Sequence, residues 1–500
     1  MNPKNHSFEI WKAFREKADI FSDYTAVLSV SGQVTFKELY GKAEQLSESL
    51  SKSGIQPGDV IGIALPNITD FVISFLALCR LSAIVALISP KYQTSELKAV
   101  IDNLAPRCLL VSSGQLGDFE RKITSYRADM IETKINNEIT CLTFPDNPSA
   151  GKRHPFLDDA ALIKFTSGST GEPKGIALSA ANILAETENV VDTLQMTQKD
   201  RILAVVPISH SYGFDLGVLA MLSSGATLVL GENFIPRRIL SDLETRGITI
   251  FLGVPSMYRF FLETPLNMPP DLSQIRYLLS CTAPLSPQMI IEFASKFGQP
   301  LCQHYGSSET GAVTTHVPAK VYTHPDSVGL PMRNVQIGIY DRDGNELSAD
   351  EEGEVVVRSR AVALGYIMGE PKDRITITDG TYRTGDTGVL DKNGYLYIRG
   401  RIDGMINVGG HKVSPLEVAQ VLESHSAVRE AAVIGVIDQS GGQIVYAAVT
   451  LKSAAMENDI LEFCRRHLAE YKVPRRIDIM DSLPRTAAGK VKLDPENIKW

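Results

Sequence analysis

The chain has 500 residues, of which 44% are hydrophobic and 22% charged, and its formal net charge is −8. This composition is ordinary for a soluble globular protein, and the length exceeds the roughly 250–300 residues at which a single hydrophobic core stops growing. We therefore expect more than one domain. The negative charge argues against nucleic acid as the main partner, but it is compatible with a local basic pocket for nucleotide phosphates.

The cysteine pattern and the N-terminal residues both predict a cytoplasmic protein. Six cysteines are scattered without a Cys-x-x-Cys pair, which favours reduced thiols over a disulfide framework or a structural metal. The first residues lack the apolar stretch of a secretory signal. The apolar run Phe71–Ile88 is nearly long enough to span a membrane, but the charge of Arg80 interrupts it. We predict instead a buried helix that turns into a strand, and no membrane span.

Helical and strand patterns alternate from the N-terminal end. The capping box Thr35–Glu38 opens a helix, Gly54 ends it, and the buried strand Val60–Leu65 follows. Up to residue 111 the pattern continues as helix, strand, helix and strand. This rhythm predicts a mostly parallel sheet covered by helices. Residues 113–158 are more polar and less regular, so we expect a surface excursion there.

Strands that end in polar turns recur between residues 182 and 309. Examples are the turns Pro207–Asp215 and His304–Glu309. In open α/β sheets ligands bind at the carboxyl ends of the strands, so these turns are predicted to converge on one crevice. From about residue 325, turn pairs separate short strands, which predicts a small barrel or sheet. The α/β pattern then resumes over the last ~100 residues, enough for an independent small domain.

One stretch between two apolar strands is suited to gripping an anion. Residues Phe165–Gly175 combine four hydroxyls, three glycines and one lysine. Glycines allow close approach of the backbone, and hydroxyls and a lysine favour phosphate oxygens. A flexible Ser/Gly linker has a similar composition but no reason to lie between two strands. The order of residues differs from the Walker pattern, so we predict a phosphate-binding loop of another kind. Its candidate contacts are Thr166, Ser167, Gly168, Ser169, Thr170, Gly171 and Lys174.

Six motifs in order make the whole chain resemble the adenylate-forming superfamily, which includes acyl- and aryl-CoA synthetases, stand-alone adenylation enzymes and beetle luciferases. They are Phe165–Gly175, Pro207–Gly213, Tyr305–Gly311, Tyr382–Asp386, Gly400–Gly404 with Gly409–Lys412, and Pro484–Lys490. The resemblance implies an α/β fold. Its large N-terminal domain, residues 1–400, would contain two helix-covered, mostly parallel sheets and a small β-barrel-like subdomain. A hinge at residues 401–403 and a small mobile α+β domain at residues 404–500 would follow.

The resemblance also implies an ATP- and Mg²⁺-dependent ligase that forms a carbon–sulfur bond. A carboxylic acid would attack the α-phosphate of ATP, pyrophosphate would leave, and the acyl group of the adenylate would pass to coenzyme A or to the phosphopantetheine of a carrier protein. Three alternatives are an enzyme that loads an amino acid with a non-α amine onto a carrier protein, a non-catalytic nucleotide-binding module and an oxygen-using, luciferase-like activity.

Matches to the family's motifs assign the ATP contacts. The phosphate loop would hold the β- and γ-phosphates, and Glu309 would bind Mg²⁺, which prefers hard oxygen ligands. The carboxylate of Asp386 would accept hydrogen bonds from the ribose hydroxyls, and Arg401 would contact the ribose or a phosphate. The residues along the adenine would be Tyr305, Gly306 and Ser307.

The same matches assign the groups that act on the acid. Lys490 would arrive on the mobile domain and offset the charge that develops on the α-phosphate and the substrate carboxylate. His210 would form a gate between the ATP and acyl sites, and Asp403 would be the hinge residue. The tunnel for the pantetheine arm would be lined by Gly409, Gly410 and Lys412.

The acyl pocket is where the sequence departs from the family. Ser280, Cys281 and Thr282 would line or back the pocket, and the last two stand where smaller residues are commoner. Asp215 follows the gate histidine closely. A carboxylate in an apolar pocket is costly unless it meets a cation or hydrogen-bond donors. It would therefore cap a helix or bind a substrate amine, and the sequence leaves the acid itself (fatty, aryl or amino) undetermined.

Overall fold

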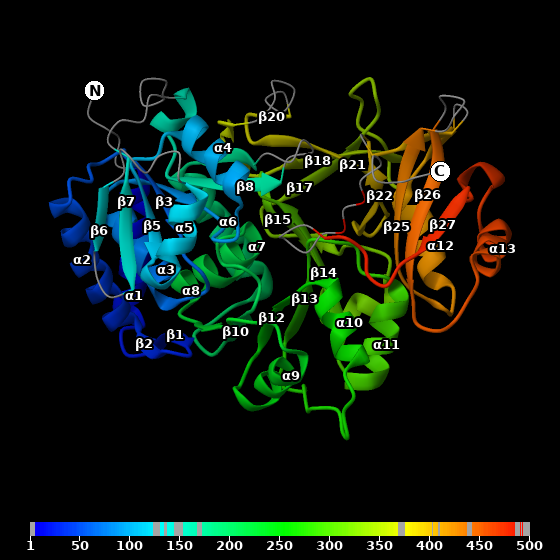
Figure 1. Cartoon of the computed structure of the whole chain (residues 1–500), viewed down its shortest axis with the longest axis horizontal. Coiled ribbons are helices and arrows are strands. Elements are labelled where there is room, and N and C mark those ends of the chain that lie inside the picture. The colour runs from blue at the N-terminus through cyan, green and yellow to red at the C-terminus, as the bar shows by residue number, and fades with distance from the viewer. Residues whose placement is uncertain are drawn as a thin grey trace.

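We describe a computed structural model of the chain (Figure 1). The structure describes residues 6–123, 131–134, 138–144, 154–167, 173–368, 376–402, 404–408, 411–437, 443–485, 491 and 493. Among these residues, no helix combines the length and the apolar character that crossing a membrane requires.

The first large sheet has eight strands in the order β19-β9-β8-β4-β3-β5-β7-β6. Its central strands β8, β4, β3 and β5 are parallel, and the outer ones are antiparallel. The bounds are β3 (Val60–Ala64), β4 (Ile84–Leu87), β5 (Cys108–Ser112), β6 (Ile131–Lys134), β7 (Ile139–Thr143), β8 (Leu162–Ser167), β9 (Pro173–Leu178) and β19 (Gly365–Tyr366). The expected surface excursion at residues 113–158 is partly wrong, because β7 and β6 extend this sheet at its edge.

The second large sheet has nine strands in the order β16-β15-β14-β13-β12-β10-β11-β1-β2. It is parallel from β14 to β1 and antiparallel at both ends. The bounds are β1 (Thr25–Ser29), β2 (Gly32–Thr35), β10 (Arg201–Ala204), β11 (Thr227–Leu230), β12 (Ile250–Gly253), β13 (Tyr277–Ser280), β14 (Leu301–Ser307), β15 (Gly311–Thr315) and β16 (Leu330–Pro331).

Helices cover these sheets, and their ends follow from local sequence. Thr35 and Glu38 form the expected capping box at α2, and Ser179 with Asn182 forms another at α6. Helix α3 buries ten of its residues, and Arg80 near its end donates to Ser47 of α2 at 2.6 Å. The apolar run is therefore a buried helix, as predicted. The helices are α1 (His6–Ile20), α2 (Phe36–Lys52), α3 (Thr69–Arg80), α4 (Thr94–Leu104), α5 (Leu116–Lys122), α6 (Ala180–Leu194), α7 (Ser211–Gly213), α8 (Ala220–Ser224), α9 (Pro236–Thr245), α10 (Pro255–Glu263) and α11 (Pro287–Phe297).

A smaller β-sheet and an α/β unit complete the chain. The small sheet has the order β17-β18-β21-β20, with β22 paired to β21. Its strands are β17 (Gln336–Tyr340), β18 (Glu352–Arg358), β20 (Ile377–Thr378), β21 (Thr381–Leu390) and β22 (Leu396–Arg401). The C-terminal unit contains β23 (Ile406–Val408), β24 (His411–Val413), α12 (Pro415–Ser424), β25 (Val428–Ile437), β26 (Gln443–Leu451), α13 (Glu457–His467) and β27 (Arg476–Ile479). The sequence-based fold class is confirmed.

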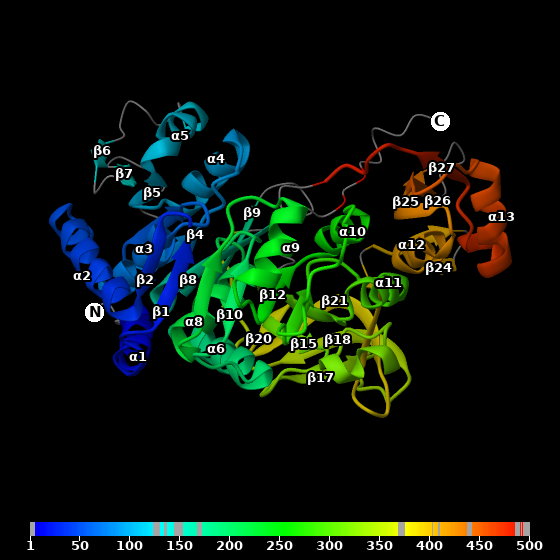
Figure 2. The same ribbon diagram turned by 90° about the horizontal axis from the view of Figure 1, so that it is seen from below.

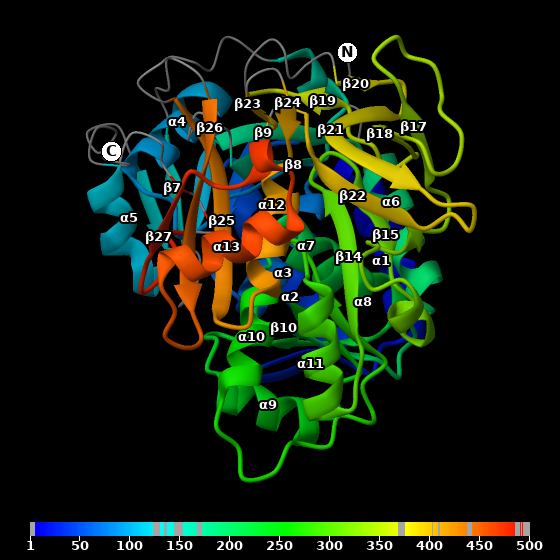
Figure 3. The ribbon, with the colours of Figure 1, turned by 90° about the vertical axis from the view of Figure 1, so that its right-hand side faces the viewer.

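The C-terminal unit has a hydrophobic core of its own, and it lies beside the second large sheet. Val418, Val449 and Ile460 belong to this separate cluster. In Figures 1 and 2 the unit stands at the end of the molecule opposite the N-terminus, next to α10 and α11. Figure 3 looks onto it, with α13 in front. Ion pairs cross this boundary: Arg259 of α10 lies 3.4 Å from Glu430, and Arg429 lies 2.9 Å from Glu263.

Candidate active site

The anion-binding stretch is the connection of a β-hairpin. Strands β8 and β9 pair antiparallel, with Thr166 opposite Lys174, which confirms the strands predicted on either side of the loop. The loop residues Gly168, Ser169, Thr170 and Gly171, and the side chain of Ser167, lie outside the described residues. The hairpin nevertheless fixes where the loop starts and ends, because Ser167 pairs with Pro173 at the last position of the ladder.

Glu309 is tied to this hairpin. Its side chain is buried, and the phenol of Tyr366 donates a 2.6 Å hydrogen bond to its Oε1. Tyr366 lies in β19, directly opposite Ile176 of β9. Burial and the neighbouring Glu309 charge raise the pKa of Tyr366 far above its ordinary value, so the phenol stays a donor. Carboxylate and hydroxyl oxygens, such as those of Glu309 and of the predicted phosphate loop, are a donor set that suits Mg²⁺.

Asp386, Tyr305 and Arg401 meet in a second cluster. The Tyr305 hydroxyl donates to Asp386 Oδ2 at 2.5 Å, and Arg401 Nη1 donates to Oδ1 at 3.1 Å. The register of β21 and β22 places Asp386 directly opposite Arg401. Gly306, next to Tyr305, lies so close to β15 that an added Cβ would sit 2.3 Å from the carbonyl oxygen of Gly311. Residues predicted to contact the nucleoside are thus brought together.

The His210 loop is anchored by Asn67, a residue that the sequence analysis missed. Asn67 Oδ1 accepts from the Ile208 N–H at 3.0 Å, and Nδ2 donates to the Val206 carbonyl at 3.0 Å. Asn67 follows strand β3 in the first sheet, so its amide joins the two large sheets at their strand ends. A polar amide immediately after a buried strand and Pro66 was the signal that could have identified it.

The same loop contacts the segment that carries Glu309. His210 precedes α7, and the next residue, Ser211, shares a 2.6 Å hydrogen bond with Ser308. The predicted convergence of the turns after β10 and β14 is therefore observed. Gly213 is required here, because an added Cβ would lie 2.4 Å from the Pro207 carbonyl oxygen.

The helix-cap role expected for Asp215 is wrong. Asp215 is the second residue of a π-helix, Phe214–Leu219, which continues α7 without a break. Its side chain is buried, and Lys164 Nζ lies 2.7 Å from both carboxylate oxygens. The cation that a buried carboxylate requires is thus supplied by β8 of the first sheet. In the sequence, Lys164 stands within the apolar run that leads to the anion-binding stretch, and nothing there points to this partner.

The candidate acyl-pocket residues form the turn after β13. Ser280 ends the strand, and within the described residues its buried hydroxyl has no hydrogen-bond partner. Cys281 is buried, and Thr282 has a φ of 75°, in the left-handed region that favours glycine. Burial, and then the neighbouring Cys281 of this turn, raise the pKa of Tyr212 well above its ordinary value.

Three parts of the prediction fall on positions that the structure does not describe. Lys490, Asp403, Gly409 and Gly410 lie outside the described residues, and so does the side chain of Lys412. Their neighbours are placed: β23 and β24 form the hairpin on either side of Gly409 and Gly410, and Arg485 forms an antiparallel bridge with Val491 around Lys490.

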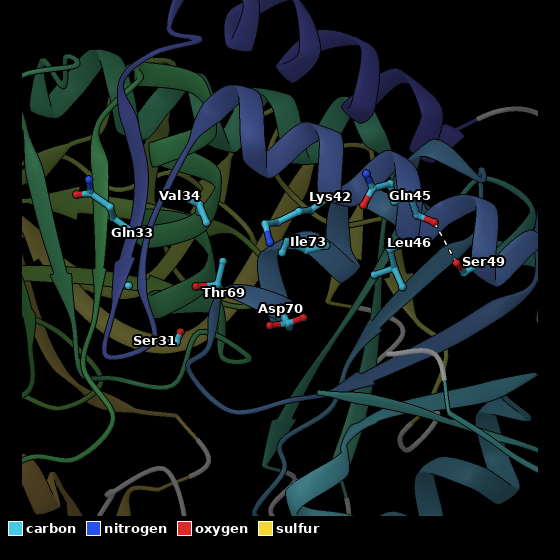
Figure 4. A pocket seen from close by; sticks show the side chains of 11 residues that line it. Ser31, Gln33, Val34, Lys42, Gln45, Leu46, Ser49, Thr69, Asp70 and Ile73 are labelled. Atoms are coloured by element: carbon cyan, nitrogen blue, oxygen red, sulfur yellow. Dashed lines mark hydrogen bonds between the residues drawn. The ribbon is translucent and has the colours of Figure 1, made fainter. Parts of the chain in front are cut away.

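A cavity of about 430 Å³ lies elsewhere, between the β1–β2 hairpin, α2 and α3 (Figure 4). Lys42, Asp70 and Thr69 are among its lining residues. None of the predicted site residues lines it, so it is separate from the clusters around Glu309 and Asp386.

Comparisons with known proteins match most of the chain. The family described as AMP-binding enzyme matches residues 14–367, and the family described as AMP-binding enzyme C-terminal domain matches residues 417–490. The chain is 31% identical to the oxalate–CoA ligase of Arabidopsis thaliana over 483 residues, which cover 93% of each protein.

Two solved structures resemble the chain over nearly its whole length. ATP-bound MatB from Rhodopseudomonas palustris is 26% identical and superimposes with a TM-score of 0.83, over 96% of this chain and 97% of the other. The o-succinylbenzoate CoA synthetase of Bacillus subtilis, in complex with its acyl-adenylate intermediate, is also 26% identical, with a TM-score of 0.81 and 96% coverage of both chains.

Proposed function

Because the chain belongs to the AMP-binding enzyme family, within the adenylate-forming superfamily, we propose that it is an ATP-dependent ligase that joins a small carboxylic acid to coenzyme A through an acyl-adenylate. The observation that carries the proposal is the hydrogen bond from Tyr366 to Glu309. It ties the carboxylate assigned to Mg²⁺ to β19, which pairs with the strand that leaves the phosphate loop.

The residues that the structure describes fit the ATP half of the site. Asp386 would accept hydrogen bonds from the ribose, sharing its oxygens with Tyr305 and Arg401. Glu309 and the hydroxyls of the phosphate loop would hold Mg²⁺, which supplies charge neutralisation for the pyrophosphate leaving group. The Ser211–Ser308 contact would keep the His210 gate next to this site.

The acid half of the reaction depends on the C-terminal unit. Lys490 would stabilise the charge that develops as the substrate carboxylate attacks the α-phosphate. We assign residues 1–400 to the large domain, 401–403 to the hinge and 404–500 to the small domain. The separate core around Val418 and Val449 supports an independently folded small domain. After adenylation it would rotate and bring the Gly409–Gly410 tunnel and Lys412 to the site.

The thiol acceptor in this proposal is coenzyme A rather than a carrier protein. The oxalate–CoA ligase that resembles the chain is named for coenzyme A. A reducing cytoplasm is the proposed compartment, and the six buried cysteine thiols support it.

The alternative of an amino-acid substrate loses its main argument. Asp215 was the candidate partner for a substrate amine, but both of its oxygens already accept bonds from Lys164.

The test is pyrophosphate exchange with a panel of dicarboxylic, aryl, fatty and amino acids, followed by coenzyme A consumption with each active acid. We expect exchange with at least one non-amino acid and thioester formation on adding coenzyme A. Exchange with amino acids alone would overturn the coenzyme A assignment. Binding of ATP without exchange for any acid would favour the non-catalytic module.

A further inference from the structure

A buried ion pair joins β8 of the first large sheet to the π-helix that follows the His210 loop. Lys164 lies in β8, three residues before Ser167, where that strand reaches the phosphate loop. Asp215 lies in the π-helix Phe214–Leu219, five residues after His210. Their side chains are only 2% and 3% exposed, and the ammonium group lies 2.7 Å from each carboxylate oxygen. The pair thus connects the phosphate hairpin to the gate loop.

A second buried carboxylate extends this pair to the segment that carries Glu309. Glu186 of α6 is 2% exposed, and its Oε1 accepts a 2.8 Å hydrogen bond from the backbone N–H of Ala312. A Cβ added to Gly311 would lie only 2.1 Å from Oε2 of Glu186, so a side chain does not fit at this position. Gly311 also has a φ of +69°. The start of β15, two residues after Glu309, therefore rests on the Glu186 carboxyl group.

Glu186 is close enough to the ion pair to be electrostatically coupled to it. Burial and the negative charge of Asp215 raise the pKa of Glu186 to about 8, while the positive charge of Lys164 opposes this shift. The raised pKa favours the protonated form of Glu186, in which the three side chains together would carry no net charge. A neutral cluster of this kind can persist in the core without a further counterion.

We propose that Lys164, Asp215 and Glu186 are positioning residues that hold the turn bearing Glu309 against the hairpin bearing the phosphate loop, an inference that rests on the proposed function. Stability alone does not call for such a cluster, because well-packed apolar residues replace a buried ion pair at little cost or with a gain. Apolar contacts, unlike hydrogen bonds and ion pairs, do not fix the direction and distance between two particular groups. The bonds of Lys164 and Glu186 fix the spacing between β8, the π-helix and β15.

The experiment compares apolar and conservative replacements. Lys164→Met combined with Asp215→Leu removes the pair without leaving a lone buried charge. Glu186→Leu removes the acceptor of the Ala312 N–H, whereas Glu186→Gln keeps it. Glu188→Leu, on the exposed side of the same helix, is the matched control. Thermal unfolding and circular dichroism report folding for each variant.

The readouts are the Kd of a non-hydrolysable ATP analogue with Mg²⁺, by calorimetry, and the separate KM values for ATP and acid in pyrophosphate exchange. We expect the double variant and Glu186→Leu each to raise the analogue Kd about tenfold, with little change in the KM for acid. For Glu186→Leu this is the range for one unsatisfied buried donor, the Ala312 N–H. Glu186→Gln and Glu188→Leu should bind like the wild type. Wild-type Kd values in both apolar variants would overturn the positioning role. Failure of the wild type itself to bind the analogue would instead overturn the proposed function.

Discussion

The phenol of Tyr366 and the carboxylate of Glu309, 57 residues apart in the sequence, are joined by a 2.6 Å hydrogen bond. Tyr366→Phe should keep the buried ring in place and release Oε1 of Glu309. Because a hydrogen bond to a charged group contributes about 1.5–3 kcal/mol, we expect the KM for Mg·ATP to rise ~10-fold or more, with a smaller effect on the KM for the acid. Steady-state exchange kinetics at several Mg²⁺ concentrations measure this. Equal changes in both KM values would show that Tyr366 does not act on the nucleotide side.

Glu186 should make the stability of the fold depend on pH. Its pKa is raised from an ordinary value of 4.5 to about 8, mainly by burial. Between these values the folded chain holds a proton that the unfolded chain has lost, so stability falls as the pH rises from about 4.5 to about 8. The charged neighbours that set this shift are Asp215 and Lys164. Urea unfolding at pH 5.5, 7 and 8.5 should show this decline in the wild type and a flatter profile in Glu186→Gln. Parallel profiles would contradict the assignment.

The anchor at Asn67 predicts an effect on the acid rather than on ATP. Asn67→Ala removes the acceptor of the Ile208 N–H and the donor to the Val206 carbonyl. With the His210 loop released, we expect the KM for the acid to rise about tenfold and the melting temperature to fall by several degrees. A lower melting temperature with an unchanged KM for the acid would limit Asn67 to a structural role.

The sequence predicted the elements that depend on local patterns. The strand expected at Val60–Leu65 is observed at Val60–Ala64, and the capping box at Thr35 is formed. These features follow from periodicity and from contacts within one turn, which a single segment encodes. The rule that ligands bind at the carboxyl ends of strands in open α/β sheets also predicted which turns would converge.

What the sequence did not reveal depends on contacts between distant segments. Lys164 and Asp215 are 51 residues apart, and a lysine in an apolar run gives no sign of its partner until the two sheets pack together. Strands β6 and β7 were missed for a related reason: their place in the sheet depends on the pairing of β7 with the distant strand β5. The roles of Lys490 and Asp403 stay predictions.

Lys490 should act on only one of the two half-reactions. We expect Lys490→Ala to reduce adenylate formation by ~100-fold or more, because an electrostatic stabiliser of developing charge is lost. Thioester formation from supplied acyl-adenylate should be nearly unaffected, because it would use the other orientation of the small domain. Single-turnover assays of each half-reaction measure the two rates. Similar losses in both would show that the domain rotation is misassigned.

The ion pairs between α10 and the C-terminal unit should stabilise the observed orientation. Arg259 lies 3.4 Å from Glu430 and 4.0 Å from Glu423, and burial raises the pKa of Glu423. We propose that this orientation is the one used for adenylation. Arg259→Met keeps the aliphatic stem and removes the charge, so adenylation should slow by a few-fold relative to thioester formation.

High salt should reduce the ratio of the adenylation rate to the thioester-forming rate in the wild type and have less effect in the variant. The exposed pair Lys98–Asp102, broken by Lys98→Met, is the control. If Arg259→Met leaves the ratio of the two half-reactions unchanged, these pairs do not govern the rotation.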